Sequence, residues 1–97
     1  MHIGACRLQL RLADNHSLKG KRQVVKSIVG RVQNRFNVSI SEIEDNELWQ
    51  VVTLGIACVS NDARHANEVL SKVVNYINDE RLDTEMVDYE IEIVPVL

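Results

Sequence analysis

The chain has 97 residues, of which 45% are hydrophobic, and a formal net charge of −3. This length predicts one compact domain spanning residues 1–97, and the hydrophobic content excludes a disordered chain. No apolar run approaches the roughly 18 consecutive residues of a membrane-spanning helix, and polar residues interrupt the N-terminal segment, so neither a span nor a secretion signal is expected. We therefore expect a cytoplasmic protein.

Residues 1–36 predict a strand followed by a helix. Apolar side chains occupy the even positions over residues 4–12 and polar ones alternate with them, which is the period of a strand with one buried face. Ser17 is a suitable N-cap, and apolar residues at helical spacing between Val25 and Phe36 predict a helix of about five turns. Asn37 is expected to end this helix.

The rest of the chain predicts three further strands and a second helix. Residues 48–59 are apolar at successive positions, which is typical of a central strand with both faces covered. The expected elements are a strand at 37–44, a hairpin turn at 44–47, a strand at 48–59, a helix around 66–77, an exit loop at 78–83 and an edge strand at 87–93.

This order of elements is that of the ferredoxin-like sandwich, an α+β fold. Two right-handed crossovers would place the first and third strands side by side in the centre of a four-stranded antiparallel sheet. Both helices would then cover one face of the sheet, and the other face would stay open.

The open face predicts association rather than base stacking. RNA-recognition modules of this topology carry several aromatic rings on their central strands, whereas only Trp49 is available here. Arg7 would lie opposite acidic residues of the last strand, which predicts cross-strand charge pairing. An exposed apolar group predicts a homodimer anchored by Trp49, or alternatively a satellite cluster covered by the C-terminal tail. The expected interface residues are Ile3, Ala5, Trp49 and Val51.

Charge is unevenly distributed along the chain. Residues 1–41 carry eight basic residues and one acidic residue, whereas residues 42–97 carry three basic and thirteen acidic residues. Residues 17–36 carry six of the basic residues and no acid. On a helix, the cations of this segment would flank the buried stripe on both sides, and the helix N-terminus would favour an anion.

These features predict an RNA- or anion-binding surface on the first helix. The candidate residues are Ser17, Lys19, Lys21, Arg22 and Lys26. A phosphate backbone that follows one flank of this helix would meet about three cations. The alternative is that these long basic side chains are only solvated, or pair with acids of residues 42–47 and 79–85.

Four ordered motifs also connect the chain with a known family: SLKGKR, FNVSISEI, LWQ and LGIACVSND. Over almost its whole length the chain resembles the YlxP-like family of small bacterial proteins, a domain of unknown function. The resemblance implies a ferredoxin-like fold and no established activity. Because genes of this family often lie beside those for translation factors, it also implies a suspected role in ribosome assembly or RNA handling.

The chain departs from the pattern of this family at one position of the first helix. Related chains often carry an acidic residue where this chain has Gly20, the third residue after the expected cap. Without that residue the capping box has no partner, so we expect a weaker first turn of the helix.

Cofactor and metal sites are not expected. Cys6 and Cys58 lie in apolar runs without a CxxC motif or metal-ligand spacing, which indicates buried thiols, with a disulfide or a reactive thiol as alternatives. His16 and His65 are each isolated from a recognisable nucleophile.

Catalysis is also not expected. The acylphosphatases share this topology, and by analogy Arg22 with Asn61 would serve as their arginine and asparagine, but their glycine-rich first loop is missing. The leading hypothesis is a non-catalytic protein that binds ribosomal or other structured RNA. The alternative is a protein-interaction module that uses the open sheet face or the acidic second half, and a small-anion site is less favoured.

Overall fold

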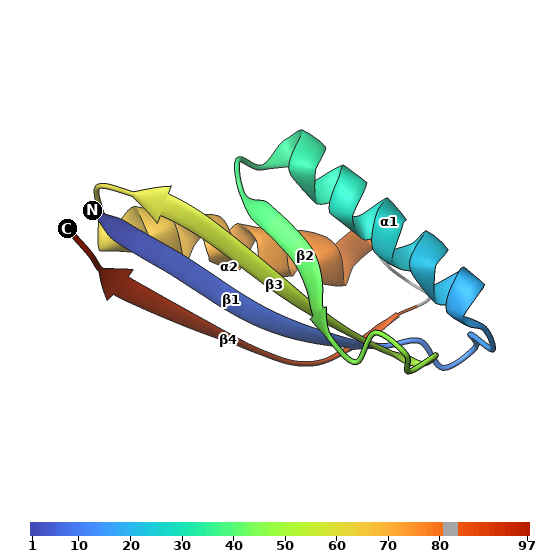
Figure 1. Ribbon diagram of the computed structural model, residues 1–97. Coiled ribbons are helices and arrows are strands. Elements are labelled where there is room, and N and C mark those ends of the chain that lie inside the picture. Colours follow the sequence, from blue (N-terminus) through green and yellow to red (C-terminus); the bar gives the residue numbers. More distant parts are fainter. Residues whose placement is uncertain (81–83) are drawn as a thin grey trace.

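Six elements follow one another in the order β-α-β-β-α-β in the computed structural model, which describes residues 1–80 and 84–97 (Figure 1). They are β1 (His2–Arg11), α1 (Leu18–Arg35), β2 (Ser39–Glu44), β3 (Val51–Ser60), α2 (Ala63–Glu80) and β4 (Glu85–Pro95). This order and the two layers confirm the ferredoxin-like α+β fold expected from the sequence.

The four strands form one sheet in the order β2-β3-β1-β4, and every neighbouring pair is antiparallel. In the central pair Arg7 lies opposite Gly55, and on its other side Arg7 lies opposite Glu90. Both helices pack on the same face: α2 lies along β1, β3 and β4, and α1 covers β2 (Figure 1).

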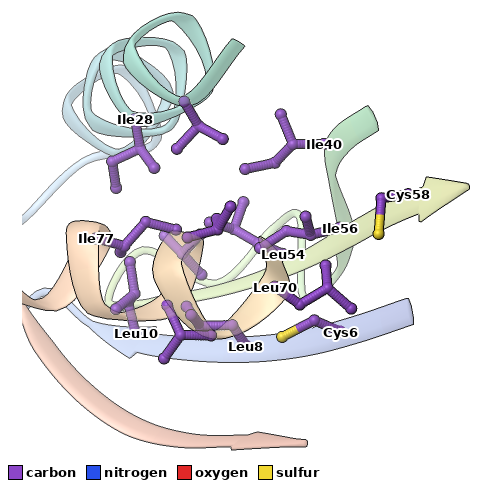
Figure 2. Close-up of a cluster of buried hydrophobic side chains, with 14 of the residues drawn as sticks. Cys6, Leu8, Leu10, Ile28, Ile40, Leu54, Ile56, Cys58, Leu70 and Ile77 are labelled. Atoms are coloured by element: carbon purple, nitrogen blue, oxygen red, sulfur yellow. The ribbon is translucent and has the colours of Figure 1, made fainter. Parts of the chain in front are cut away.

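The core lies between this face and the helices. Even positions of β1 from Gly4 onward are buried, Leu8 and Leu10 fully, as the alternating pattern predicts. They meet side chains such as Leu54 of β3 and Ile77 of α2, and Ile28 closes the cluster from α1 (Figure 2). The two layers therefore share one continuous hydrophobic cluster.

The elements differ from expectation mainly at their ends. Strand β3 begins at Val51 rather than at residue 48, because the chain before it forms a loop. Helix α2 continues to Glu80, so residues 78–80 of the expected exit loop are helical, and residues 81–83 lie outside the described part of the chain.

The molecule is elongated, with principal extents of 44 × 22 × 20 Å. The two chain ends lie side by side at one end of the sheet (Figure 1), where the Val96 N–H donates a hydrogen bond of 2.8 Å to the Met1 carbonyl oxygen. Neither α1 nor α2 has the length and hydrophobicity that would let it cross a membrane.

Candidate functional site

The first turn of α1 is capped as the sequence predicts. Ser17 has extended backbone angles, and its hydroxyl oxygen accepts a hydrogen bond of 3.0 Å from the Gly20 N–H. The side-chain amide of Asn15 donates to the Ser17 carbonyl at 2.8 Å and to the Trp49 carbonyl at 2.5 Å. One side chain therefore joins the start of α1 to the loop before β3.

Gly20 makes room for that side chain. A Cβ at position 20 would lie 2.2 Å from Oδ1 of Asn15, much closer than two unbonded atoms can approach. Since the Asn15 amide is held by two hydrogen bonds, a larger residue at position 20 would have to displace it. Gly20 thus allows the contact that Asn15 makes between the cap of α1 and the loop before β3.

Lys21 is buried, so its predicted place on an RNA- or anion-binding surface is wrong. Its side chain is only 1% exposed, and Nζ donates hydrogen bonds to the carbonyls of Asp45 at 2.5 Å and Leu48 at 2.7 Å. A carboxylate oxygen of Glu42 lies 2.9 Å from Nζ as its counter-ion. Lys21 therefore holds the β2–β3 connection and is not a surface cation. Its position seven residues before buried Ile28, on the same helical face, is the sequence signal that could have shown this.

Three of the remaining candidates form what we call the basic strip: Lys19, Arg22 and Lys26. All three side chains are exposed on α1. Among the side chains that the structure describes, which exclude those of residues 80–83, none of them has an acidic partner within 4.0 Å, since the ion pairs found there involve Arg7 and Lys21. Among the cations of α1, the expected pairing with acids of residues 42–47 thus occurs for Lys21 alone. Of the acids expected as partners at 79–85, Asp83 and the side chain of Glu80 lie outside the described part of the chain.

Arg35, on the opposite flank of α1, has a structural contact. Its guanidinium carbon lies 4.9 Å from the centre of the Tyr76 ring, and the Phe36 ring packs edge-on against Tyr76 at 5.7 Å between centroids. These contacts attach the C-terminal end of α1 to α2.

The β2–β3 connection is held from several sides, and we call residues 45–50 the braced loop. Asp45 adopts a left-handed backbone conformation with φ of 60°, and its carboxylate accepts a hydrogen bond of 2.9 Å from the buried Thr53 hydroxyl. The Gln50 side chain donates to the carbonyls of Ala13 at 3.1 Å and Asn15 at 3.3 Å. Together with Lys21, these bonds fix both ends of the loop.

The predicted dimer interface is not one patch. In the antiparallel β1–β3 pair, Ile3 lies opposite Val59, whereas Val51 lies opposite Arg11 at the other end of β1. Eight residues of strand separate the two positions, about 26 Å. Ile3 and Ala5 are therefore far from Trp49 and Val51, and the expected cluster of these four residues is wrong because the strands run in opposite directions.

The open face carries a hollow of about 410 Å³ instead. Its floor consists of small residues from three strands: Ala5, Ser39, Ser41, Gly55 and Ala57. Ile43 packs over Gly55, where any Cβ would lie 2.7 Å from Cγ2 of Ile43. Glu90 and Glu92 line the β4 side and Arg7 lines the hollow from β1, so acids outnumber bases around it by two to one.

Arg7 is paired on this face, as expected, though with a different partner. The predicted strand alignment is confirmed, since Arg7 lies opposite Glu90 and Gln9 opposite Asp88. The ion pair that Arg7 forms is with Glu44, at 3.7 Å, and both side chains are about half exposed. Such an exposed pair contributes little to stability.

Comparison with known proteins settles the family. Residues 3–91 match the family described as "Protein of unknown function (DUF503)". The chain belongs to this family. It is also similar to the "Uncharacterized protein YlxP" of Bacillus subtilis (strain 168), with 43% identity over 76 residues that cover 78% of this chain and 83% of the relative. The DUF503 match confirms the resemblance carried by the four motifs.

The cysteines of this DUF503 chain are both free and buried. Burial raises the pKa of the Cys6 thiol from its usual value near 9 to about 11, and the negative charge of Glu90 adds to this shift. Burial also raises the pKa of the Cys58 thiol. A thiol with a raised pKa is a weak nucleophile at neutral pH.

The residues suggested by the acylphosphatase analogy are not brought together. Asn61 follows the end of β3, whereas Arg22 lies near the braced loop that precedes β3. The strand between them is ten residues long, roughly 30 Å. Among the described residues, no group of three or more His, Cys, Asp or Glu side chains could hold a metal ion.

Proposed function

We propose that this protein is a non-catalytic, cytoplasmic RNA-binding protein whose partner is ribosomal or other structured RNA. The supporting observation is the basic strip, whose three exposed cations lack an acidic partner in the described part of the chain. Exposed cations without an acidic partner among the described side chains are available for phosphate oxygens, which supply most of the affinity in nucleic-acid binding.

The distribution of acidic residues also favours α1, rather than the open sheet face, as the RNA-binding surface. The hollow on the open face is lined by two acids, Glu90 and Glu92, and by one cation, Arg7, which is itself paired with Glu44, so the net charge around it would disfavour phosphates. The strip from Lys19 to Lys26 spans seven residues of helix, about 10 Å, which suits contact with a few adjacent phosphates. Three such contacts predict a slope of roughly −2 to −3 for log affinity against log salt concentration.

Co-sedimentation with ribosomal particles at several salt concentrations tests this proposal. Lys19→Glu with Arg22→Glu should abolish the salt-sensitive association, because two attractive contacts become repulsive. Arg31→Glu is the matched control, since it reverses an exposed cation on the other flank of the same helix. Equal association of the double variant and the wild type would disprove the role of the basic strip.

A second candidate is a protein-interaction module that uses the open face, including pairing with a second copy of the chain. The supporting observation is an exposed apolar row beside the hollow, formed by Ile3, Val59 and Val94 at matching positions of three adjacent strands. Analytical ultracentrifugation of the wild type and Val59→Lys tests it. A monomeric wild type argues against self-association, and a dimer that persists in Val59→Lys argues against this face.

A further inference from the structure

The braced loop presents two large apolar side chains to solvent. Leu48 is 51% exposed and Trp49 is 53% exposed, although both follow a segment whose backbone is tightly held. The Leu48 N–H and carbonyl both form hydrogen bonds, to the Asp45 carbonyl at 3.0 Å and to Lys21 Nζ at 2.7 Å. An exposed indole on a fixed backbone is therefore a distinctive feature of this end of the molecule.

The fixed backbone lowers the entropy lost when a ligand binds. A flexible loop must become ordered on binding, whereas this loop is already held by Lys21, Asn15 and Gln50. Burial of the Lys21 ammonium is unfavourable by itself. The buried ammonium nevertheless holds a loop whose largest side chains are exposed and contribute little to the core. This pattern is typical of a preorganised binding surface.

The braced loop adjoins the basic strip. The Asn15 amide donates to both the Ser17 and Trp49 carbonyls, so the backbone of Trp49 lies next to the N-terminus of α1. Lys19 and Arg22 follow in the first turns of that helix. The Trp49 indole is exposed, and its backbone lies close to the helix turns that carry these exposed cations. An aromatic ring that stacks on a base, together with cations that contact phosphates, is the combination that binds single-stranded nucleic acid.

We propose that Trp49 stacks on an unpaired base of the bound RNA while the basic strip contacts the adjacent phosphates. This inference rests on the proposed function and adds that the preferred ligand contains unpaired nucleotides next to the phosphates that α1 contacts. A duplex offers no free base face to Trp49, so it binds through the basic strip alone.

Glu47 restricts where the phosphates of a bound strand can lie. It is exposed in the braced loop, two residues before Trp49, and within the described residues it has no basic partner within 4.0 Å. Its negative charge repels a phosphate that passes close to the indole. A bound strand must therefore keep its phosphates on the α1 side of Trp49, and Glu47→Gln should relax this requirement and tighten binding.

Trp49 is the only tryptophan in the chain, so its fluorescence reports on the proposed contact directly. We would titrate the protein with a single-stranded oligoadenylate of about twelve nucleotides, which is within the usual site size for such surfaces, and with an RNA duplex of equal length. Anisotropy of a labelled oligonucleotide measures binding independently of the indole. We expect quenching of Trp49 with the single strand and little change with the duplex.

Two variants of Trp49 separate base stacking from general apolar contact, and a third variant tests the charge of Glu47. Trp49→Phe keeps an aromatic ring and should bind the single strand within about three-fold of the wild type. Trp49→Leu keeps an apolar side chain without a ring and should bind roughly ten-fold or more weakly, the equivalent of one lost stacking contact. Glu47→Gln should bind more tightly. Duplex binding should be the same for Trp49→Leu and the wild type.

The outcomes distinguish this inference from the proposed function. If labelled RNA binds with salt dependence but the indole is not quenched and Trp49→Leu binds equally well, stacking is disproved and the role of the basic strip stands. If neither RNA binds, both proposals fail. If the wild type self-associates and Trp49→Leu does not, the braced loop contacts a second copy of the chain, and the nucleotide assignment is overturned.

Discussion

Nζ of Lys21 lies 2.9 Å from a carboxylate oxygen of Glu42, with the lysine side chain 1% exposed and the glutamate side chain 18% exposed. The two residues come from α1 and β2, so this ion pair joins a helix to the strand beneath it. Removal of one member would leave the other without its counter-ion in a poorly solvated place.

We expect Lys21→Met to lower the free energy of unfolding by about 3 kcal/mol, because Glu42 and two carbonyl oxygens all lose their partner. Urea denaturation measures this change. Lys19→Met, two residues earlier and exposed, is the matched control and should stay within about 0.5 kcal/mol of the wild type. Adding Glu42→Gln to Lys21→Met should restore part of the loss, and full additivity of the two changes would contradict the pairing.

Two glycines of α1 should respond oppositely to alanine. Gly30→Ala should raise the free energy of unfolding by about 0.5–1 kcal/mol, because no atom lies within 4 Å of the added Cβ and alanine favours the helix. Gly20→Ala should lower it by about 1 kcal/mol, because displacing Asn15 removes hydrogen bonds to Ser17 and Trp49.

Thermal denaturation of the two alanine variants compares them directly. In an Asn15→Gly background the closest contact disappears and the approach to the Ser17 hydroxyl at 3.2 Å remains, so Gly20→Ala should be less destabilising there than in the wild-type background. If Gly20→Ala is as stabilising as Gly30→Ala in the wild-type background, the contact between positions 15 and 20 has no energetic importance.

The Cys6 thiol should make the protein less stable in alkali. Between pH 9 and about 11 an unfolded thiol has lost its proton while the buried Cys6 thiol retains it, so the folded state binds more protons and stability falls as pH rises. This part of the stability is complete below pH 9. The decline between pH 9 and 11 should be smaller in Cys6→Ala than in the wild type, measured by urea denaturation at each pH. Identical slopes would contradict the raised pKa.

The contact of Arg35 and Phe36 with Tyr76 should contribute to stability and not to RNA binding. Tyr76→Leu removes the cation–π and edge-on ring contacts, so the free energy of unfolding should fall by about 1–2 kcal/mol. Co-sedimentation with ribosomal particles should be unchanged after correction for the folded fraction. A loss of association at full folding would show that this end of α1 also contacts the ligand.

The alternating and helical periods were sufficient to predict the fold. The even positions of β1 and the apolar spacing of α1 depend on burial of one face, which repeats along the chain and is therefore visible in it. The alignment of Arg7 with Glu90 followed from the topology alone. The family likewise could be identified from four short motifs.

The candidate site was less predictable because it depends on contacts between distant segments. The helical period places Lys21 on the buried face of α1, but the Asp45 and Leu48 carbonyls that accept from its Nζ lie in a distant loop that this period does not show. The apolar cluster on the open face was misplaced for a simpler reason, since the antiparallel direction of β3 puts Trp49 at the opposite end from Ile3.

The hydrogen bond between Val96 and Met1 has a practical consequence. Both chain ends lie at one end of an elongated body, and the full length of β1 separates them from the braced loop (Figure 1). An affinity tag or fluorophore attached at either end would therefore stand roughly 30 Å from Trp49. A short linker could also join the two ends into a circular permutant, which would leave the sheet order intact and allow new ends to be opened elsewhere on the surface.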